Sequence, residues 1–264
     1  MRNTSAMATR LTTCGVAIMA KASEPGRTKT RLVPPLTYDE ASALNTVFIQ
    51  DVASNIIAAS QSTSIAGYVA FGPPGSESFF NAILPSEIGL FESWHQNFGD
   101  CLFSAIEQLI SRGHLAAMVL NSDGPSLPTS LLIQAAETLA QPGDRAVLGP
   151  ADDGGYYLLG LKGAHRRLFE DIDWSTNRVA KQTLTRAAEI GLPVHILATW
   201  YDVDDTSTLV RLRSELFDAD LAGEGLIPYN AVATKNLLRR FLADSGFCGR
   251  MRWGDAPPVK KVAP

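Results

Sequence analysis

A cationic loop follows the first apolar run of the chain. Four cations stand within eleven residues there, and a Pro-Gly pair at 25–26 is typical of a tight turn. Arginine forks, a lysine point charge and exposed backbone N–H groups together bind phosphate chains. The spacing is not that of a P-loop, and the alternative is a solvated basic loop. We expect phosphate binding by Lys21, Gly26, Arg27, Lys29 and Arg31.

Carboxylates follow two later apolar runs. Asp123 stands in an Asn-Ser-Asp-Gly-Pro loop, and Asp202 and Asp204 stand in a second loop. A magnesium ion on a polyphosphate usually takes one or two protein carboxylates. We therefore expect Mg²⁺ or Mn²⁺ at Asp123 and Asp204, with Asp202 as the reserve ligand. The alternatives are that Asp123 only forms an Asx-turn and that Asp204 or Asp205 only caps a helix.

A Gly-rich bend with paired carboxylates lies between these two loops, at 149–157. Paired glycines allow a ligand to approach the backbone closely, and carboxylates bind hydroxyl groups or act as a base. Asp-Gly also indicates a β-hairpin, and both interpretations can hold. Trp174 either stacks on a sugar or base, or packs as a staple before a Ser175 helix cap. We expect acceptor binding by Asp152, Asp153, Gly154, Gly155, Tyr156 and Trp174, and catalytic roles for Asp123, Asp153 and Lys29.

Apolar runs typical of buried strands alternate with amphipathic stretches. The expected strands are 15–20, 64–71, 115–120, 146–148, 156–161 and 194–198. The expected helices are 38–59, 98–112, a segment capped by Thr129, 175–190, a segment from Asp204 or Asp205 to 217, and 234–242. Strands separated by helices favour a mainly parallel sheet, hence an α/β/α sandwich of three layers. In such a sheet the loops after the strands meet at one edge, where ligands bind.

Composition limits the function further. The chain has 264 residues, 45 % of them hydrophobic, and a formal net charge of −4, which indicates a folded protein and argues against broad binding to nucleic acid or anionic membranes. No apolar run approaches the roughly 20 residues of a membrane span. Three widely spaced cysteines without a C-x-x-C pair favour a reducing cytoplasm over disulfides or zinc. The four histidines have no metal-ligand spacing, and no G-x-S-x-G elbow is present.

Five motifs, in order, resemble a bacterial family of GT-A-fold, glycosyltransferase-like proteins whose members are mostly uncharacterised. These motifs stand at 21–32, 122–125, 149–158, 174–176 and 202–204, within roughly residues 15–218. The family is similar to nucleotidyltransferases of the same fold, among them 2-phospholactate guanylyltransferase and the molybdenum-cofactor nucleotidyltransferases. The resemblance implies a nucleotide-binding domain over 14–220, with a divalent metal near Asp123. Residues 1–13 are then a flexible N-terminus, and 221–264 a helical appendage with a Pro-rich tail.

The sequence departs from the GT-A pattern in two ways. Asp123 follows Asn-Ser, so the first carboxylate of an Asp-x-Asp motif is missing, and the basic loop is typical of nucleotidyltransferases instead. The first hypothesis is a metal-dependent glycosyltransferase that uses a nucleotide-diphosphate sugar. The second is a nucleotidyltransferase that moves NMP from an NTP to a phosphorylated small-molecule acceptor and releases pyrophosphate. The third is a non-catalytic nucleotide-binding scaffold. Donor base, sugar, acceptor and oligomeric state are left open.

Overall fold

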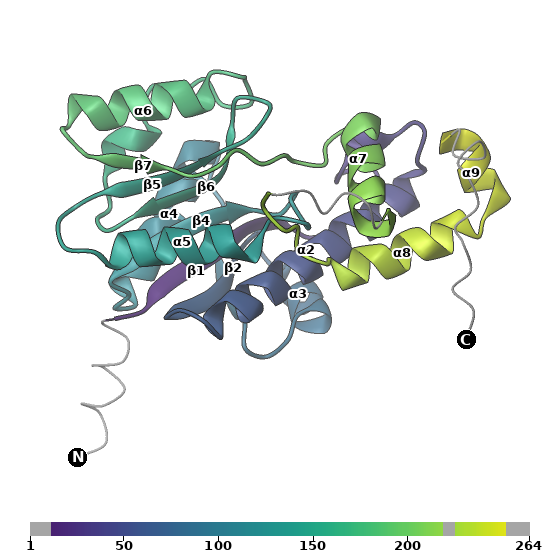
Figure 1. Cartoon of the computed structure of the whole chain (residues 1–264), viewed down its shortest axis with the longest axis horizontal. Coiled ribbons are helices and arrows are strands. Elements are labelled where there is room, and N and C mark those ends of the chain that lie inside the picture. The colour runs from purple at the N-terminus through teal and green to yellow at the C-terminus, as the bar shows by residue number, and fades with distance from the viewer. Residues whose placement is uncertain (1–11, 219–224, 252–264) are drawn as a thin grey trace, which may run out of the picture.

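A seven-stranded sheet lies at the centre of the computed structural model, which describes residues 12–218 and 225–251 (Figure 1). The strand order is β3-β2-β1-β4-β6-β5-β7. Within the described residues β6 alone runs antiparallel to its neighbours β4 and β5. The sheet is therefore mainly parallel, as predicted. Its strands are β1 Cys14–Lys21, β2 Ile65–Gly72, β3 Gly89–Glu92, β4 Ala116–Asn121, β5 Ala146–Pro150, β6 Tyr156–Leu161 and β7 Val194–Ile196.

Helices cover both faces of the sheet. Side chains alternate along a strand, so Val16 and Ile18 enter the apolar core on one face while Ala17 enters the core on the other. The first core is closed by α2 Tyr38–Ser60, α3 Glu77–Ile83, α5 Thr129–Ala140, α7 Thr206–Phe217, α8 Val232–Leu242, α9 Ser245–Met251 and the 3₁₀ turn η1 Thr30–Leu32. The second is closed by α4 Phe98–Ser111, α6 Val179–Glu189 and η2 Arg166–Phe169. The predicted three-layer α/β/α sandwich is confirmed.

Helix starts follow local capping chemistry in some places and tertiary contacts in others. Thr37 forms the capping box that its Thr-x-x-Glu sequence predicts, and of the two predicted caps Asp204 and Asp205 it is Asp205 that caps α7, in a box with Thr208. Two predicted caps are wrong. Ser175 has a φ of 63° and α6 begins four residues later, at Val179. Thr129 opens α5, but its hydroxyl donates to Asn55 on α2 instead of capping the helix.

The strand order reverses direction between β1 and β4. From β1 the chain passes to β2 and β3 on one side, and then returns to place β4 on the other side. The loops that follow β1 and β4 therefore leave the same edge in opposite directions and open a crevice between them. Open α/β sheets bind ligands at this topological switch point.

The C-terminal part of the described chain packs on α2. In Figure 1 helix α8 lies along α2, at the end of the molecule away from β7. Ala231, before α8, has a left-handed backbone and provides no side-chain cap. The buried Asp51 of α2 takes that role, because its carboxylate accepts from the backbone N–H groups of Ala233 at 2.9 Å and Thr234 at 2.7 Å. Burial raises the pKa of Asp51, and these bonds act against the rise.

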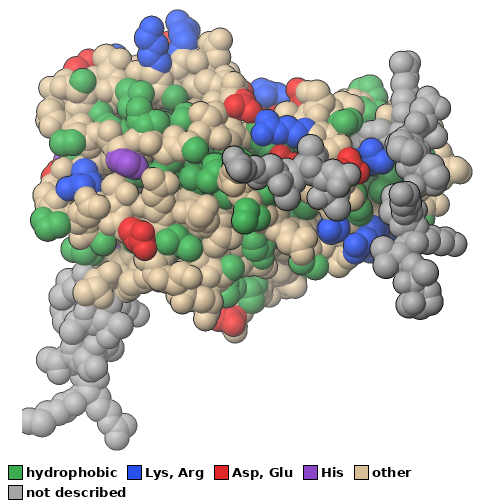
Figure 2. All heavy atoms as spheres, in the orientation of Figure 1, with side chains coloured by type: hydrophobic (Ala, Val, Ile, Leu, Met, Phe, Trp, Pro, Cys, Tyr) green, Lys and Arg blue, Asp and Glu red, His purple; other side chains and the backbone are tan. Residues whose placement is uncertain are grey.

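The surface shown in Figure 2 has Lys and Arg side chains interspersed with Asp and Glu among neutral and hydrophobic ones. None of the described helices is both long and apolar enough to cross a membrane. The three cysteines, Cys14, Cys101 and Cys248, are free thiols. Residues 1–11 of the predicted flexible N-terminus (1–13) and the Pro-rich tail after 251 lie outside the described residues.

Replacing Asp51 with Ala should lower the free energy of unfolding by about 1–3 kcal/mol, because two buried N–H groups of α8 lose their acceptors. Asp51→Asn keeps one accepting oxygen and should lose less. Urea unfolding followed by circular dichroism measures both variants against Asp218→Ala, which removes an exposed acid at the end of α7. Equal stability of Asp51→Ala and Asp218→Ala would show that the cap contributes nothing.

Candidate functional site

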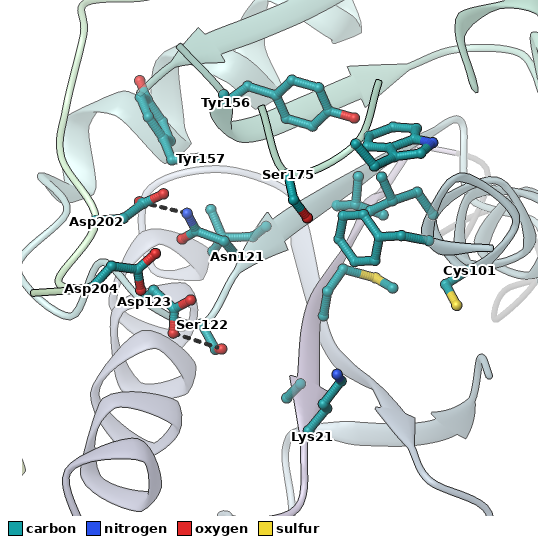
Figure 3. A pocket seen from close by; sticks show the side chains of 18 of the residues that line it. Lys21, Cys101, Asn121, Ser122, Asp123, Tyr156, Tyr157, Ser175, Asp202 and Asp204 are labelled. Atoms are coloured by element: carbon teal, nitrogen blue, oxygen red, sulfur yellow. Dashed lines mark hydrogen bonds between the residues drawn. The ribbon is translucent and has the colours of Figure 1, made fainter. Parts of the chain in front are cut away.

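A cavity of about 670 Å³ opens where β1 and β4 end and the antiparallel β6 begins (Figure 3). The basic loop after β1 forms one wall, and the acidic loops after β4 and β7 meet beside it. Three segments far apart in the sequence thus meet in one place. The predicted site residues that line the cavity are Lys21, Arg27, Lys29, Arg31, Asp123, Asp153, Gly155, Tyr156, Trp174, Asp202 and Asp204.

Lys29 joins the basic loop to the acidic loops directly. Its ammonium nitrogen lies 2.6 Å from Oδ1 of Asp123 and 3.0 Å from Oδ1 of Asp204, and it donates to the backbone oxygen of Val203 at 2.8 Å. The three N–H groups of the ammonium therefore have three acceptors, and the side chain is only 5 % exposed. Burial alone would lower the pKa of Lys29, but the two carboxylates outweigh burial and raise the pKa. Lys29 is a cation held between two acids.

Local backbone geometry aims Lys29 at the acids. Its φ of 51° is in the left-handed region, at the residue that precedes the η1 turn. Such a conformation in a non-glycine residue is strained, and the surrounding contacts maintain it. On the acidic side, the Val203 N–H donates to the Asp123 backbone oxygen at 2.9 Å, which fixes the two acidic loops against each other. Asp205, one residue on, caps α7 and leaves Asp204 free to face the cavity.

Asp202 lies deepest among the acids. Its Oδ1 accepts a hydrogen bond of 2.6 Å from the Asn121 side chain (Figure 3). Burial, followed by the neighbouring Asp123 carboxylate, raises the pKa of Asp202 to about 7, and Asp204 and Asp153 contribute less. The hydrogen bond from Asn121 acts in the opposite direction and lowers the pKa. The cluster of carboxylates has more negative charge than Lys29 neutralises. Asn121 stands where an Asp-x-Asp motif would have its first carboxylate, and here it orients an acid instead of supplying one.

The donor set fits a hard divalent cation in its chemistry. Carboxylate oxygens are the ligands that Mg²⁺ and Mn²⁺ prefer, and the excess negative charge around Asp202 would attract a cation. The described residues hold no group of three or more His, Cys, Asp or Glu side chains arranged to bind a metal alone. A cation there would use one or two carboxylates, with its other ligands coming from phosphate and water. It would compete with Lys29 for Asp123 and Asp204.

The other cations of the loop are exposed. Arg31 approaches Asp204 at 3.6 Å, and Arg27 pairs with Glu24 at 3.4 Å. The ammonium nitrogen of Lys21 lies 5.5 Å from the centre of the Trp94 ring, and both residues line the cavity. Exposed cations beside a cavity remain available to an anionic ligand, whereas Lys29 is already engaged. Gly26 has a φ of 79° and makes the turn of this loop without lining the cavity.

The Gly-rich bend is the hairpin turn between β5 and β6, as its Asp-Gly pair indicates. Asp153 faces the cavity and accepts from the Gly155 N–H at 2.8 Å. Asp152 points elsewhere, to Arg211 on α7 at 2.9 Å. Gly154 is also outside the lining: its φ is 88°, and a Cβ there would lie 2.2 Å from the Asn177 backbone oxygen. Its role is to let the 174–177 segment approach.

Sequence reasoning missed part of the wall. Ser93, Trp94 and Phe98 line the cavity but were not predicted. Ser93 and Trp94 follow the four-residue β3, and Phe98 is the first residue of α4, where an apolar side chain usually indicates the core. Ser175 lines the cavity through its left-handed backbone. The sequence signal for this part of the wall was the Trp-Ser-Thr motif at 174–176, which we interpreted as the start of a helix capped by Ser175.

Comparison with known proteins agrees with this architecture. Residues 55–176 match a family described as "Uncharacterized protein conserved in bacteria (DUF2064)". The predicted family resemblance is confirmed. No curated protein matches the chain.

Solved structures share the fold. A "putative nucleotide-diphospho-sugar transferase" from Desulfovibrio desulfuricans G20 is similar with a TM-score of 0.74 and 24 % identity, over 92 % of this chain and 99 % of that one. A 4-diphosphocytidyl-2C-methyl-D-erythritol synthase from Anaerococcus prevotii DSM 20548 is similar with a TM-score of 0.50 and 10 % identity, over 79 % of this chain and 98 % of that one. The predicted nucleotide-diphospho-sugar transferase-like fold is confirmed.

Replacing Lys29 with Met should lower the free energy of unfolding by about 1–3 kcal/mol, less than for a fully buried pair because both partner acids are about a third exposed. Mn²⁺ should then raise the melting temperature more in Lys29→Met than in the wild type, since the two acids have lost their resident cation. Arg27→Met removes an exposed charge from the same loop and is the control. An unchanged response to Mn²⁺ would contradict the competition between lysine and metal.

Proposed function

We propose that this chain is a metal-dependent transferase with a nucleotide donor, acting as a glycosyltransferase on a nucleotide-diphosphate sugar. The observation that supports the proposal is the meeting of a cationic loop and a carboxylate cluster in one cavity at the switch point of the sheet. Phosphates bind to cations such as those of the loop, and a divalent cation on the phosphates binds to carboxylates such as those of the cluster. The Desulfovibrio protein of similar fold is described as a putative nucleotide-diphospho-sugar transferase, which supports this proposal.

The residues would divide the work as follows. Lys21, Arg27 and Arg31 would bind the diphosphate, and Lys29 would reach it when released from the acids. Asp123 and Asp204 would hold Mg²⁺ or Mn²⁺, with Asp202 in reserve. The bound cation would supply charge neutralisation on the departing nucleoside diphosphate.

Asp153 would act as the base for the acceptor. The acceptor oxygen forms a bond to the anomeric carbon, and the bond from that carbon to the diphosphate oxygen breaks. The acceptor proton goes to the Asp153 carboxylate, and the electron pair of the broken bond leaves on the diphosphate. Asp153 lines the cavity, and its backbone neighbour Gly155 holds the carboxylate in place through one N–H group.

Nucleotidyl transfer is the second candidate. The basic loop supports it, because four cations are more than a diphosphate requires and suit a triphosphate. Under this reaction the acceptor phosphate attacks the α-phosphorus and pyrophosphate leaves. Purified protein offered NTPs or nucleotide-diphosphate sugars distinguishes the two reactions by release of pyrophosphate or of nucleoside diphosphate. Nucleotide binding without either product would favour the scaffold.

Asp123→Asn should abolish Mn²⁺-dependent nucleotide binding, because the amide keeps the shape and removes the anionic ligand. Isothermal titration of UDP and GDP with and without Mn²⁺ measures the loss, which we expect to exceed tenfold in Kd. Asp218→Asn, far from the cavity, is the matched control. Unchanged metal-dependent binding in Asp123→Asn would remove the support for this proposal.

A further inference from the structure

The cavity is divided by charge. Every Lys or Arg that lines it within the described residues is the last residue of β1 or belongs to the loop after it. The opposite wall, formed by the start of β6, the start of α4 and the segment 174–177 before α6, presents aromatic rings, hydroxyls and an amide. We call it the aromatic wall, and its residues are Phe98, Tyr156, Trp174, Ser175, Thr176 and Asn177. The acids lie between these two walls.

Two rings of the aromatic wall form a fixed platform. The centres of the Phe98 and Trp174 rings lie 5.4 Å apart, at 85° to each other. Gly99 makes the arrangement possible, since a Cβ there would lie 2.9 Å from atoms of the indole. Phe98 is nevertheless 51 % exposed, although it stands beside a cavity and a packed tryptophan. An apolar surface held open at a cavity mouth suits a ring-shaped ligand.

The aromatic wall also has an unused hydrogen-bonding group. The Tyr156 hydroxyl is buried and has no hydrogen-bond partner among the described residues. The adjacent Tyr157 hydroxyl, by contrast, donates to the Ala198 backbone oxygen at 2.9 Å. Figure 3 shows the Ser175 side chain directed into the same cavity, from a backbone with a φ of 63°. A buried hydroxyl without a hydrogen-bond partner, next to a strained serine, indicates that a polar group of a ligand supplies the missing hydrogen bond.

We propose that the aromatic wall binds the acceptor, and that the acceptor is an uncharged alcohol with a ring. This inference rests on the proposed glycosyl transfer and names its second substrate. The ring packs against Trp174 and Phe98, and a ring hydroxyl pairs with Tyr156. The reacting hydroxyl faces Asp153, which takes its proton. A phosphorylated acceptor finds no cation on this wall, so the division of charge favours glycosyl over nucleotidyl transfer.

Phenyl β-D-glucoside and its 6-phosphate are the probes, because they share the ring system and differ only at position 6, where a neutral hydroxyl is replaced by an anionic phosphate. Calorimetry in the presence of Mn²⁺ and UDP should show the glucoside binding at least about tenfold tighter than the phosphate. Tyr156→Phe should weaken glucoside binding about fivefold, as expected for one lost hydrogen bond, and leave the Kd of UDP unchanged. Trp174→Ala should weaken glucoside binding about tenfold, and Trp174→Phe, which keeps an aromatic ring, should weaken it much less. Tyr38→Phe, whose ring is exposed outside the cavity, is the control.

Tighter binding of the 6-phosphate overturns the inference, and so does an unchanged glucoside Kd in Tyr156→Phe. Absence of glucoside binding to the folded wild type up to about 20 mM overturns it as well. Failure of the proposed function looks different: no nucleotide binds, while the glucoside, titrated alone, still distinguishes wild type from Tyr156→Phe.

Discussion

The Lys29 bridge between Asp123 and Asp204 makes one site out of distant segments. A buried ammonium with three acceptors holds the loop after β1 against the loops after β4 and β7. Opposite charges at such distances attract by several kcal/mol even at an effective dielectric constant of about 20. A ligand that carries phosphate competes with the acids for Lys29, and a cation competes with Lys29 for the acids. A metal–phosphate complex satisfies both sides at once, so it can enter at a lower cost than either part alone.

Most of the fold follows from patterns within the sequence. The apolar run before Lys21 predicts β1, and the capping box at Thr37 predicts α2 to within a residue at its start. The errors lie where tertiary contacts decide. The Ser175 motif has the composition of a cap, yet the segment turns left-handed and packs against Gly154 and Gly99 before α6 begins. The four residues of β3 are too few to show the alternation of apolar and polar side chains that predicts a strand. This strand forms because it pairs with β2.

The site was predictable in its residue types and less so in its contacts. Strand ends followed by Lys and Asp indicate an edge site, because parallel strands place their loops together. Residue types cannot show that Lys29 pairs with the acids while Arg27 and Lys21 remain exposed to a ligand. That difference depends on the left-handed backbone of Lys29 itself. Asp152 and Asp153 are adjacent and chemically alike. Only the position of Arg211 on α7 draws one away from the cavity and leaves the other in it.

In the proposed function, the acids would also act on the choice of acceptor. Burial and, after it, the carboxylates of Asp123, Asp204 and Asp153 raise the pKa of Asp202, so these acids lie within electrostatic reach of one another. A second anion brought to the aromatic wall would meet this field, and at an effective dielectric constant of about 20 each carboxylate 8 Å away costs about 2 kcal/mol. In the proposed function, the donor's phosphates avoid that cost because they would lie against the cations of the loop. In the proposed function, the acids that would draw a divalent cation inward would also disfavour an anion on the aromatic wall and favour a neutral ligand there.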